Sequence, residues 1–134
     1  IINETLNKTT LSMLKKNDKV NLEQSLRYND RISGHLVQGH VEGLGKVLKK
    51  NNVNDNFVAF TIELDKKLMK YCIYKGSITI DGISLTISNI NEYDIEVSII
   101  PHTFNNTTLF YRNVGDTVNI ETDMIAKYVE KIVV

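Results

Sequence analysis

Residues 75–86, KGSITIDGISLT, carry side chains that could bind a polar heterocycle. Ser84 and Thr86 lie two residues apart, and side chains at that spacing on a strand share one face. Two adjacent hydroxyls, beside Lys75 and the Asp-Gly turn at 81–82, offer hydrogen bonds to the nitrogens and oxygens of a flat ring. The alternative is an ordinary hairpin turn followed by surface hydroxyls, and these residues alone do not decide between the two.

Two histidines stand in the glycine-rich segment 34–43, GHLVQGHVEG. His35 and His40 are five residues apart, so on a strand they would point to opposite faces and would not share a metal ion. Because no cysteine or aspartate at ligand spacing completes a site, we expect no metal. Each histidine taken alone is more often a hydrogen-bonded structural group than a catalyst. The glycines would let a flat ligand approach the backbone closely.

A third segment, residues 99–108, reads IIPHTFNNTT and combines a strand end, a proline and a threonine-rich turn. Such a segment exposes backbone amides and hydroxyls that could contact a ligand. For Thr107 and Thr108 the start of a plain helix is the better interpretation, because threonine is a common N-cap.

Short strands bounded by turn residues must position these groups. Runs rich in β-branched residues predict strands at 36–47 (bent by its glycines), 57–64, 77–80, 83–90, 95–100 and 117–121. We expect a hairpin loop at 51–56, a helical turn at 65–70, and an end to the fifth strand at Pro101. Six short strands within about 90 residues predict an all-β fold, a small six-stranded antiparallel barrel with short helices.

The period of the pattern changes after the last strand, where residues 123–134 predict an amphipathic helix. Thr122 would cap it, with Asp123 in the favourable first turn. One apolar stripe follows at helical spacing: Ile125, Tyr128, Val129, Ile132 and Val133. Since the barrel fills its own interior, this stripe needs another surface, and we expect an oligomerisation helix.

The chain also repeats itself. Residues 1–24 align without a gap with residues 99–122, and 11 of the 24 aligned positions are identical. A period this long indicates a duplicated domain rather than a solenoid. We therefore expect 1–24 to end a first barrel, 25–33 to be a linker and 34–122 to form the second barrel. A first copy of equal length would place roughly 65 residues before Ile1.

The composition excludes several classes of protein. Sixteen basic residues balance sixteen acidic ones, so no overall field favours nucleic acid or an anionic membrane. No apolar stretch is long enough to span a bilayer. The single cysteine, Cys72, rules out an internal disulfide, fits a reducing compartment such as the cytoplasm, and lies in an apolar run typical of a buried residue.

Four segments in one order resemble the C-terminal barrel of riboflavin synthase, the α-type enzyme. They are GHLVQGHVEGLG, LMKYCIYKGSITIDGISLT, SIIPHTFNNTTL and the tail GDTVNIETDMIAKYVE. Residues 1–24 are similar to the end of that family's N-terminal barrel, in agreement with the repeat. The resemblance covers practically the whole chain. It implies two similar six-stranded Greek-key barrels, a C-terminal helix that assembles a homotrimer, and no metal or redox cofactor.

The implied reaction is a dismutation of two molecules of 6,7-dimethyl-8-ribityllumazine, the last step of riboflavin biosynthesis. One molecule gives a four-carbon unit to the other, which yields riboflavin and 5-amino-6-ribitylamino-pyrimidinedione. In this family the active site forms between the N-terminal barrel of one subunit and the C-terminal barrel of its neighbour. The resemblance also suggests lumazine synthase as a further partner.

The resemblance assigns roles to individual residues. The C7 methyl of the lumazine is a carbon acid, so the reaction needs a modest base and positioned donors. His40 is the candidate for proton transfer. Ser84 and Thr86 match ring-facing hydroxyls that would bind the ring heteroatoms or assist addition at C7, and Asp81 would orient the turn or a hydroxyl partner. The resemblance thus implies that these three residues are catalytic together with His40. The positions that match the family's pocket are Val41, Lys75, Gly76, Ile83, Ile100, Pro101, His102 and Thr103. Only Asn3, Glu4 and Thr5, with Ile2, remain from the pocket of the N-terminal barrel, so this chain would complete half a site at most.

Three other classes compete with the enzyme. Relatives of the synthase bind a lumazine or flavin as a fluorescent antenna without turnover, but they tend to lack the ligand residues that are intact here. A nucleic-acid-binding barrel would need a basic face with interleaved aromatics, whereas this chain is neutral and has no tryptophan. A purely structural domain is the remaining alternative.

Overall fold

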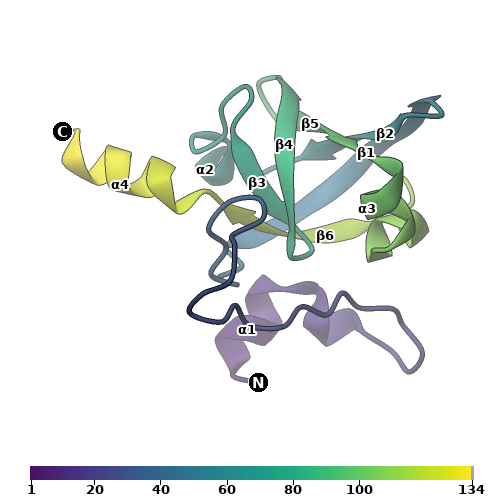
Figure 1. Cartoon of the computed structure of the whole chain (residues 1–134), viewed down its shortest axis with the longest axis horizontal. Helices are drawn as coiled ribbons and strands as arrows, with labels where there is room; N and C mark the ends of the chain where they lie inside the picture. Colours follow the sequence, from purple (N-terminus) through teal and green to yellow (C-terminus); the bar gives the residue numbers. More distant parts are fainter. Residues whose placement is uncertain (134) are drawn as a thin grey trace.

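Six β-strands pair edge to edge into a closed antiparallel barrel in the computed structural model, which describes residues 1–133 (Figure 1). The strands are β1 Gly43–Asn54, β2 Phe57–Glu63, β3 Ser77–Ile80, β4 Ile83–Ile90, β5 Asp94–Ile99 and β6 Thr117–Thr122. Their order around the barrel is β1-β2-β5-β4-β3-β6, and β6 closes it on β1. Since β3, β4 and β5 are sequential neighbours and β6 returns beside β3, the topology is a Greek key. The predicted fold class is confirmed.

The core forms from alternate residues of these strands, because side chains two apart point to the same side of a strand. Phe60 and Ile62 of β2, and Ile78 and Ile80 of β3, are fully buried. Burial of each such side chain contributes about 1.5–3 kcal/mol. Gly45 lets β1 lie against this core, since a Cβ there would stand 2.7 Å from Ile62 Cγ2.

Short helices occupy the connections between strands. They are α1 Asn3–Lys8 and the 3-10 turn η1 Thr10–Met13 before the barrel, α2 Lys66–Met69 after β2, α3 Pro101–Asn105 and the 3-10 turn η2 Thr108–Tyr111 after β5, and α4 Met124–Ile132 after β6. Asp65 caps α2, because its side-chain Oδ1 accepts a hydrogen bond from the Lys67 N–H at 2.7 Å. The predicted helical turn at 65–70 and the predicted end of β5 before Pro101 are therefore confirmed.

The predicted strand 36–47 is wrong over its first half, because β1 begins only at Gly43. Two main-chain groups of the preceding loop bond to distant side chains instead of a neighbouring strand. The His35 N–H donates to Ser84 Oγ at 3.2 Å. The Gln38 N–H donates to Glu121 Oε1 at 2.8 Å. Residues 34–42 therefore form a loop over the outside of the barrel, and the two histidines do not follow the alternation of a strand.

The hairpin loop predicted at 51–56 is shorter than expected. β1 continues to Asn54 and β2 begins at Phe57, so only two residues separate the strands. The Asn54 side chain closes the turn by accepting a hydrogen bond from the Asn56 N–H at 2.8 Å.

The last helix, α4, projects away from the barrel (Figure 1). Its N-cap is Asp123, whose Oδ1 accepts from the Ile125 N–H, so the prediction that Thr122 caps it is wrong. Thr122 instead bonds to Glu42 through both its N–H and its hydroxyl. The predicted apolar stripe is present and exposed, with Ile132 77% accessible. Within the described part of the chain, no helix is both long and apolar enough to cross a membrane.

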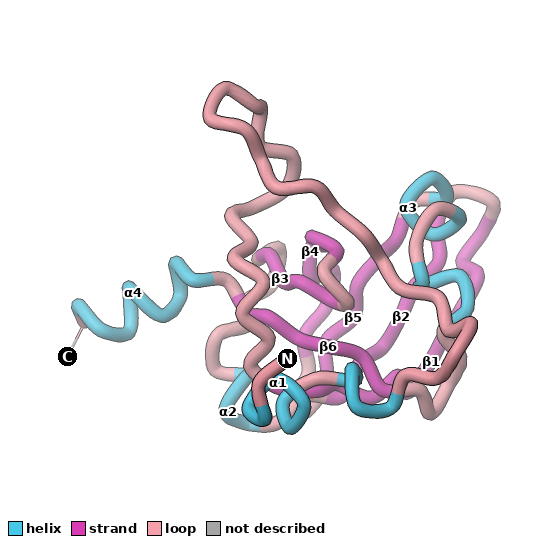
Figure 2. Tube along the Cα trace, turned by 90° about the horizontal axis from the view of Figure 1, so that it is seen from below, coloured by secondary structure: helices cyan, strands magenta, loops and turns pink. Residues whose placement is uncertain are grey.

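The N-terminal segment lies along the outside of the barrel, and Figure 2 shows it linked to β1 by a long loop. Its turns copy those between β5 and β6. The Thr9 hydroxyl donates to Thr5 O at 2.7 Å, and the Thr107 hydroxyl donates to Thr103 O at 2.8 Å, each pair 98 residues from the other. Residues 19–24, which align with β6, form no strand. The domain boundaries proposed from the repeat stay predictions.

Candidate functional site

Ser84 and Thr86 lie on the outer face of β4, as the spacing predicts, while Leu85 between them is buried in the core. On the neighbouring strand β3, Thr79 faces Ser84 and Ser77 faces Thr86. Thr86 is exposed, and Ser84 is half-buried beneath the loop of residues 34–42. The two hydroxyls therefore share a face but have different surroundings.

The turn that precedes Ser84 owes its shape to the Asp81-Gly82 pair. Both residues have positive φ angles, +49° and +82°, as a two-residue hairpin turn of the favoured hand requires. The carboxylate of Asp81 accepts from Arg112 Nε at 2.9 Å and lies 2.8 Å from Arg112 Nη2. Its other oxygen accepts from the Asn119 N–H at 2.8 Å. Asp81 thus orients the turn, while its carboxylate faces η2 and β6.

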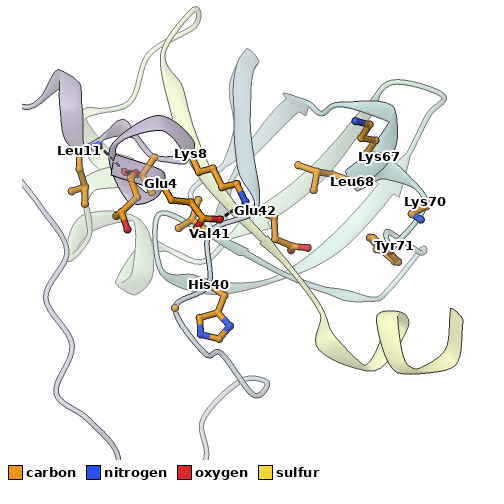
Figure 3. Close-up of a pocket in the computed structure, with 13 residues that line it drawn as sticks. Glu4, Lys8, Leu11, His40, Val41, Glu42, Lys67, Leu68, Lys70 and Tyr71 are labelled. Atoms are coloured by element: carbon orange, nitrogen blue, oxygen red, sulfur yellow. Dashed lines mark hydrogen bonds and ion pairs between the residues drawn. The ribbon is translucent and has the colours of Figure 1, made fainter. Parts of the chain in front are cut away.

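His40 and Val41 lie at a different place, on the wall of a cavity of about 930 Å³ between α1 and α2 (Figure 3). Glu4 and Thr5 of α1 line the same cavity. His40 is exposed and lies at the cavity's edge in Figure 3. The structure therefore brings His40 together with the end of the preceding repeat.

Glu42 also lines this cavity and ties the loop to β6 and α4. Burial disfavours its charged form, but hydrogen bonds from Lys127 and Thr122 outweigh burial and hold the pKa of Glu42 below its ordinary value. The Lys127 Nζ lies 2.6 Å from Glu42 Oε1, and the Thr122 N–H donates to Oε2 at 2.6 Å. Glu42 is thus ionised at neutral pH and fixes the start of α4.

The remaining predicted residues lie at three further positions. Lys75 has φ +61° and stacks its ammonium 5.5 Å from the Tyr74 ring, while Gly76 lines an apolar cavity of about 490 Å³ against α4. Ile83 lines a cavity of about 600 Å³ with Ser84 and with residues 105–108. The last group belongs to the first turns of α3 and α1, mostly exposed: Ile100, Pro101, His102, Thr103 and Asn3.

Comparisons with known proteins show the family and the fold of the chain. The profile of the family described as lumazine binding domain matches residues 38–123, the barrel and the second half of the loop before it. The chain belongs to the lumazine binding domain family. The riboflavin synthase of Actinobacillus pleuropneumoniae is 44% identical over 131 residues, which cover 98% of this chain and 60% of that protein. For the riboflavin synthase of Bacillus subtilis (strain 168) the identity is 41% over 128 residues, 96% of this chain and 59% of that protein.

Solved structures give the same fold for this lumazine binding domain. LumP complexed with 6,7-dimethyl-8-(1'-D-ribityl) lumazine superposes with a TM-score of 0.80 at 26% identity, over 90% of this chain and 64% of that one. LumP complexed with riboflavin superposes with a TM-score of 0.83 at 24% identity, over 91% of this chain and 66% of that one. The chain spans about 60% of the length of the synthases that it matches.

The lumazine binding domain does not gather its predicted residues into one cavity. His40 and Val41 share a cavity with Glu4 and Thr5. Ser84 lines two other cavities, of about 600 and 530 Å³, with the linker and the 19–23 segment. His40 and Val41 lie at the end of the loop 34–42 that leads into β1, whereas Ser84 contacts the start of that loop at His35. Among residues 1–133, no cluster of three or more His, Cys, Asp or Glu side chains could hold a metal ion.

Four residues of this domain that lie on or next to the predicted ones were missed. Arg112 pairs with Asp81, Thr79 lies beside Ser84 on β3, and Glu121 lies beside Thr79 on β6. His35 contacts Ser84 directly, through its imidazole Nδ1 at 2.7 Å. The strand alternation could have placed Thr79 opposite Ser84, because β3 and β4 form a two-residue hairpin. Nothing in the spacing indicates the contacts of His35 or Arg112.

Proposed function

We propose that the protein to which this lumazine binding domain belongs is a riboflavin synthase. It would convert two molecules of 6,7-dimethyl-8-ribityllumazine into riboflavin and 5-amino-6-ribitylamino-pyrimidinedione. The single observation that carries the proposal is the 44% identity to a riboflavin synthase over practically the whole chain. The solved LumP complexes, which hold this lumazine and riboflavin, support the choice of ligands.

The outer face of the β3–β4 hairpin would bind the ring of the ligand. Ser84 and Thr86 offer two hydroxyls on the outer face of β4 for hydrogen bonds to the ligand. Asp81 would act indirectly, because its carboxylate already bonds to Arg112 and Asn119 and fixes the turn from which Ser84 extends. We assign Asp81 to positioning and the hydroxyls to ligand contact.

His40 would move protons in this proposal. The first chemical requirement is removal of a proton from the C7 methyl group, for which imidazole is a suitable base. His40 is exposed at the edge of a cavity of about 930 Å³, large enough for a bicyclic ligand and its ribityl chain. Glu4 and Thr5 line that cavity as well, so the end of the preceding repeat would contribute to a site of this protein.

Two ligands must meet for a dismutation, and most of the rate gain would come from holding them face to face. The two groups of predicted residues, around Ser84 and around His40, lie at opposite ends of the loop 34–42. We propose that each group meets its complement on another barrel, in a homotrimer whose contacts include the exposed stripe of α4. Association with lumazine synthase and a cytoplasmic location remain predictions, the latter supported by the free Cys72.

The deciding experiment mixes the longest natural form of the protein with 6,7-dimethyl-8-ribityllumazine and follows riboflavin by its absorbance. Riboflavin formation without any added cofactor would establish the activity. If no riboflavin forms while the lumazine fluorescence changes on binding, the protein is a non-catalytic lumazine or flavin carrier. If neither signal changes, the proposed ligand class is wrong.

A further inference from the structure

The outer surface of the barrel carries a row of polar side chains that is shielded from solvent. In this row, Thr79 on β3 pairs with Ser84 on β4 on one side and with Glu121 on β6 on the other. Outward-facing residues of a small barrel are usually exposed, but Thr79 is 2% and Glu121 6% accessible. The loop of residues 34–42 covers this row, so contacts with these side chains must hold the loop in place.

His35 is the residue of this loop that binds the row. Its imidazole Nδ1 lies 2.7 Å from Ser84 Oγ, and its Nε2 lies 3.2 Å from Thr79 Oγ1. Its main-chain N–H also donates to Ser84 Oγ at 3.2 Å. One histidine therefore makes three polar contacts with two hydroxyls, on adjacent strands.

The donor in each contact depends on the tautomer of His35. With the proton on Nε2, the Ser84 hydroxyl donates to Nδ1 and the Nε2–H donates to Thr79 Oγ1. We take this tautomer as part of the proposal, because 2.7 Å is a usual distance for a hydroxyl donor. Since the His35 main-chain N–H occupies one lone pair of Ser84 Oγ, the other lone pair remains to accept a hydrogen bond.

The residue before His35 leaves no room for the loop to lie differently. Gly34 has φ +81°, and a Cβ on it would stand 2.7 Å from Ser84 Cβ. Glycine is needed here both for the left-handed backbone and for the approach to Ser84. Ser84 is consequently held between the backbone of Gly34 and the side chain of His35.

We propose that His35 is a positioning residue for Ser84. It holds the hydroxyl with its hydrogen directed at the imidazole, so that Oγ presents a fixed acceptor lone pair to the adjacent cavities of about 600 and 530 Å³. The matching ligand group is a donor, a ring N–H or a ribityl hydroxyl. The inference rests on the proposed function only for the identity of the ligand.

The first test measures the imidazole itself by ¹⁵N NMR, in the longest natural form of the protein at neutral pH and without ligand. We expect the His35 Nδ1 signal to be that of a nitrogen without a proton, and to shift in Ser84→Ala. A protonated Nδ1, or a signal that does not respond to Ser84→Ala, overturns the proposal. Neither NMR result depends on catalytic turnover. An absence of synthase activity would therefore contradict the proposed function without contradicting the role of His35.

The second test is a double-mutant cycle with binding of 6,7-dimethyl-8-ribityllumazine and riboflavin measured by fluorescence. We expect His35→Ala and Ser84→Ala each to weaken binding about tenfold. If the two act as a unit, the double variant is no weaker than Ser84→Ala within about twofold. His35→Asn, whose amide can take the place of Nδ1, should recover part of the loss. Ser88→Ala, on the same strand, is the control for a general effect on β4.

Two glycine variants separate positioning from folding. Gly34→Ala and Gly115→Ala both place a side chain at a positive φ, +81° and +93°, but nothing lies within 4 Å of a Cβ at Gly115. We expect only Gly34→Ala to weaken ligand binding, by displacing Ser84. Equal binding by both glycine variants, or additive losses in the His35–Ser84 cycle, would show that the contact is merely structural.

Discussion

Two reciprocal pairs hold the N-terminal segment to the barrel, and their removal gives a sharp test of the structure. Asn119 Oδ1 accepts from the Thr10 N–H at 2.8 Å, and its Nδ2 donates to the Thr10 hydroxyl at 2.9 Å. In the same way, Asn21 Oδ1 accepts from the Thr108 N–H at 2.9 Å, and its Nδ2 donates to the Thr108 hydroxyl at 2.9 Å. Each residue of one pair lies 98 positions from its counterpart in the other, the offset of the sequence repeat.

We predict that Asn119→Ala detaches the first turn of η1 from the barrel. Thr10 is 8% accessible, so the variant leaves a buried N–H and a buried hydroxyl without their partners. An unsatisfied buried group costs about 1–3 kcal/mol. Asn21→Ala should cost about 1 kcal/mol more, because Asn21 Nδ2 also donates to Asp81 O at 2.8 Å. The loss should weaken ligand binding too, since α1 carries Glu4 and Thr5 into the cavity of His40.

Amide hydrogen exchange followed by mass spectrometry measures the effect of the variant both in the N-terminal segment and in the barrel. We expect Asn119→Ala to increase exchange across residues 5–13 by one to two orders of magnitude, the equivalent of about 1–3 kcal/mol. The core strand β2 should exchange as in the wild type. Asn7→Ala, an exposed asparagine of the same segment, is the matched control. Unchanged exchange in 5–13 would refute the reciprocal contacts, and equal acceleration in β2 would show that the variant only destabilises the whole barrel.

Three further predictions follow from buried or paired groups. Burial raises the pKa of the Cys72 thiol to about 11, so iodoacetamide at pH 8 should modify it at least a hundredfold more slowly than in the unfolded chain; equal rates would place it at the surface. The pKa of Glu42 is lowered on folding, so its stabilising effect is complete above its unfolded value near 4.5 and is lost as pH falls through the lower folded value. The protection of the α4 amides relative to their intrinsic exchange should therefore fall in acid, and Glu42→Gln should lower it at neutral pH as well; unchanged protection in both would rule out the Glu42–Lys127 tether. Arg112→Ala leaves the Asp81 carboxylate, 5% accessible, without its cation and should lower the free energy of urea unfolding by about 3 kcal/mol, whereas a loss below about 0.5 kcal/mol would make the pair negligible.

The strands and their turns could be predicted because their causes are local. Alternation in 57–64 and 83–90 reports which side chains meet the core, and the Asp-Gly pair at 81–82 specifies its own turn. Pro101 likewise ends β5 and begins α3 through its own fixed φ. Each of these signals lies within a few residues of the structure that it predicts.

The loop of residues 34–42 could not be predicted in this way. Its alternation and glycines are compatible with a bent strand, but its backbone is satisfied by Ser84 and Glu121, which lie 49 and 83 residues further along the chain. The same distance in sequence concealed the role of His35 and the Arg112–Asp81 pair. Contacts between side chains brought together only by barrel closure leave no periodic trace in the sequence.

The cap of α4 was missed for a related reason. Both Thr122 and Asp123 are good N-caps, so the sequence offers two adjacent starts. The choice depends on Glu42, which takes the N–H and the hydroxyl of Thr122 and leaves Asp123 to cap the helix. A carboxylate 80 residues earlier in the chain therefore sets the first residue of α4.

The repeat explains why the two groups of predicted site residues are separated in this chain. Thr5 on α1 and Thr103 on α3 are equivalent positions in the repeat. In each case the threonine four residues later donates its hydroxyl to the main-chain carbonyl of this residue. Thr5 already has a barrel beside it, the one that carries His40, because Thr10 and Asn119 fix α1 there. Thr103 has the segment 19–24 beside its helix instead, and that segment aligns with β6 but has no strands with which to pair. If residues 19–24 were a strand of a second barrel, that barrel would lie beside Thr103 and Ser84, just as the barrel that carries His40 lies beside Thr5. We therefore predict two related ligand sites, one per repeat, which is the geometry that the proposed reaction between two identical molecules needs.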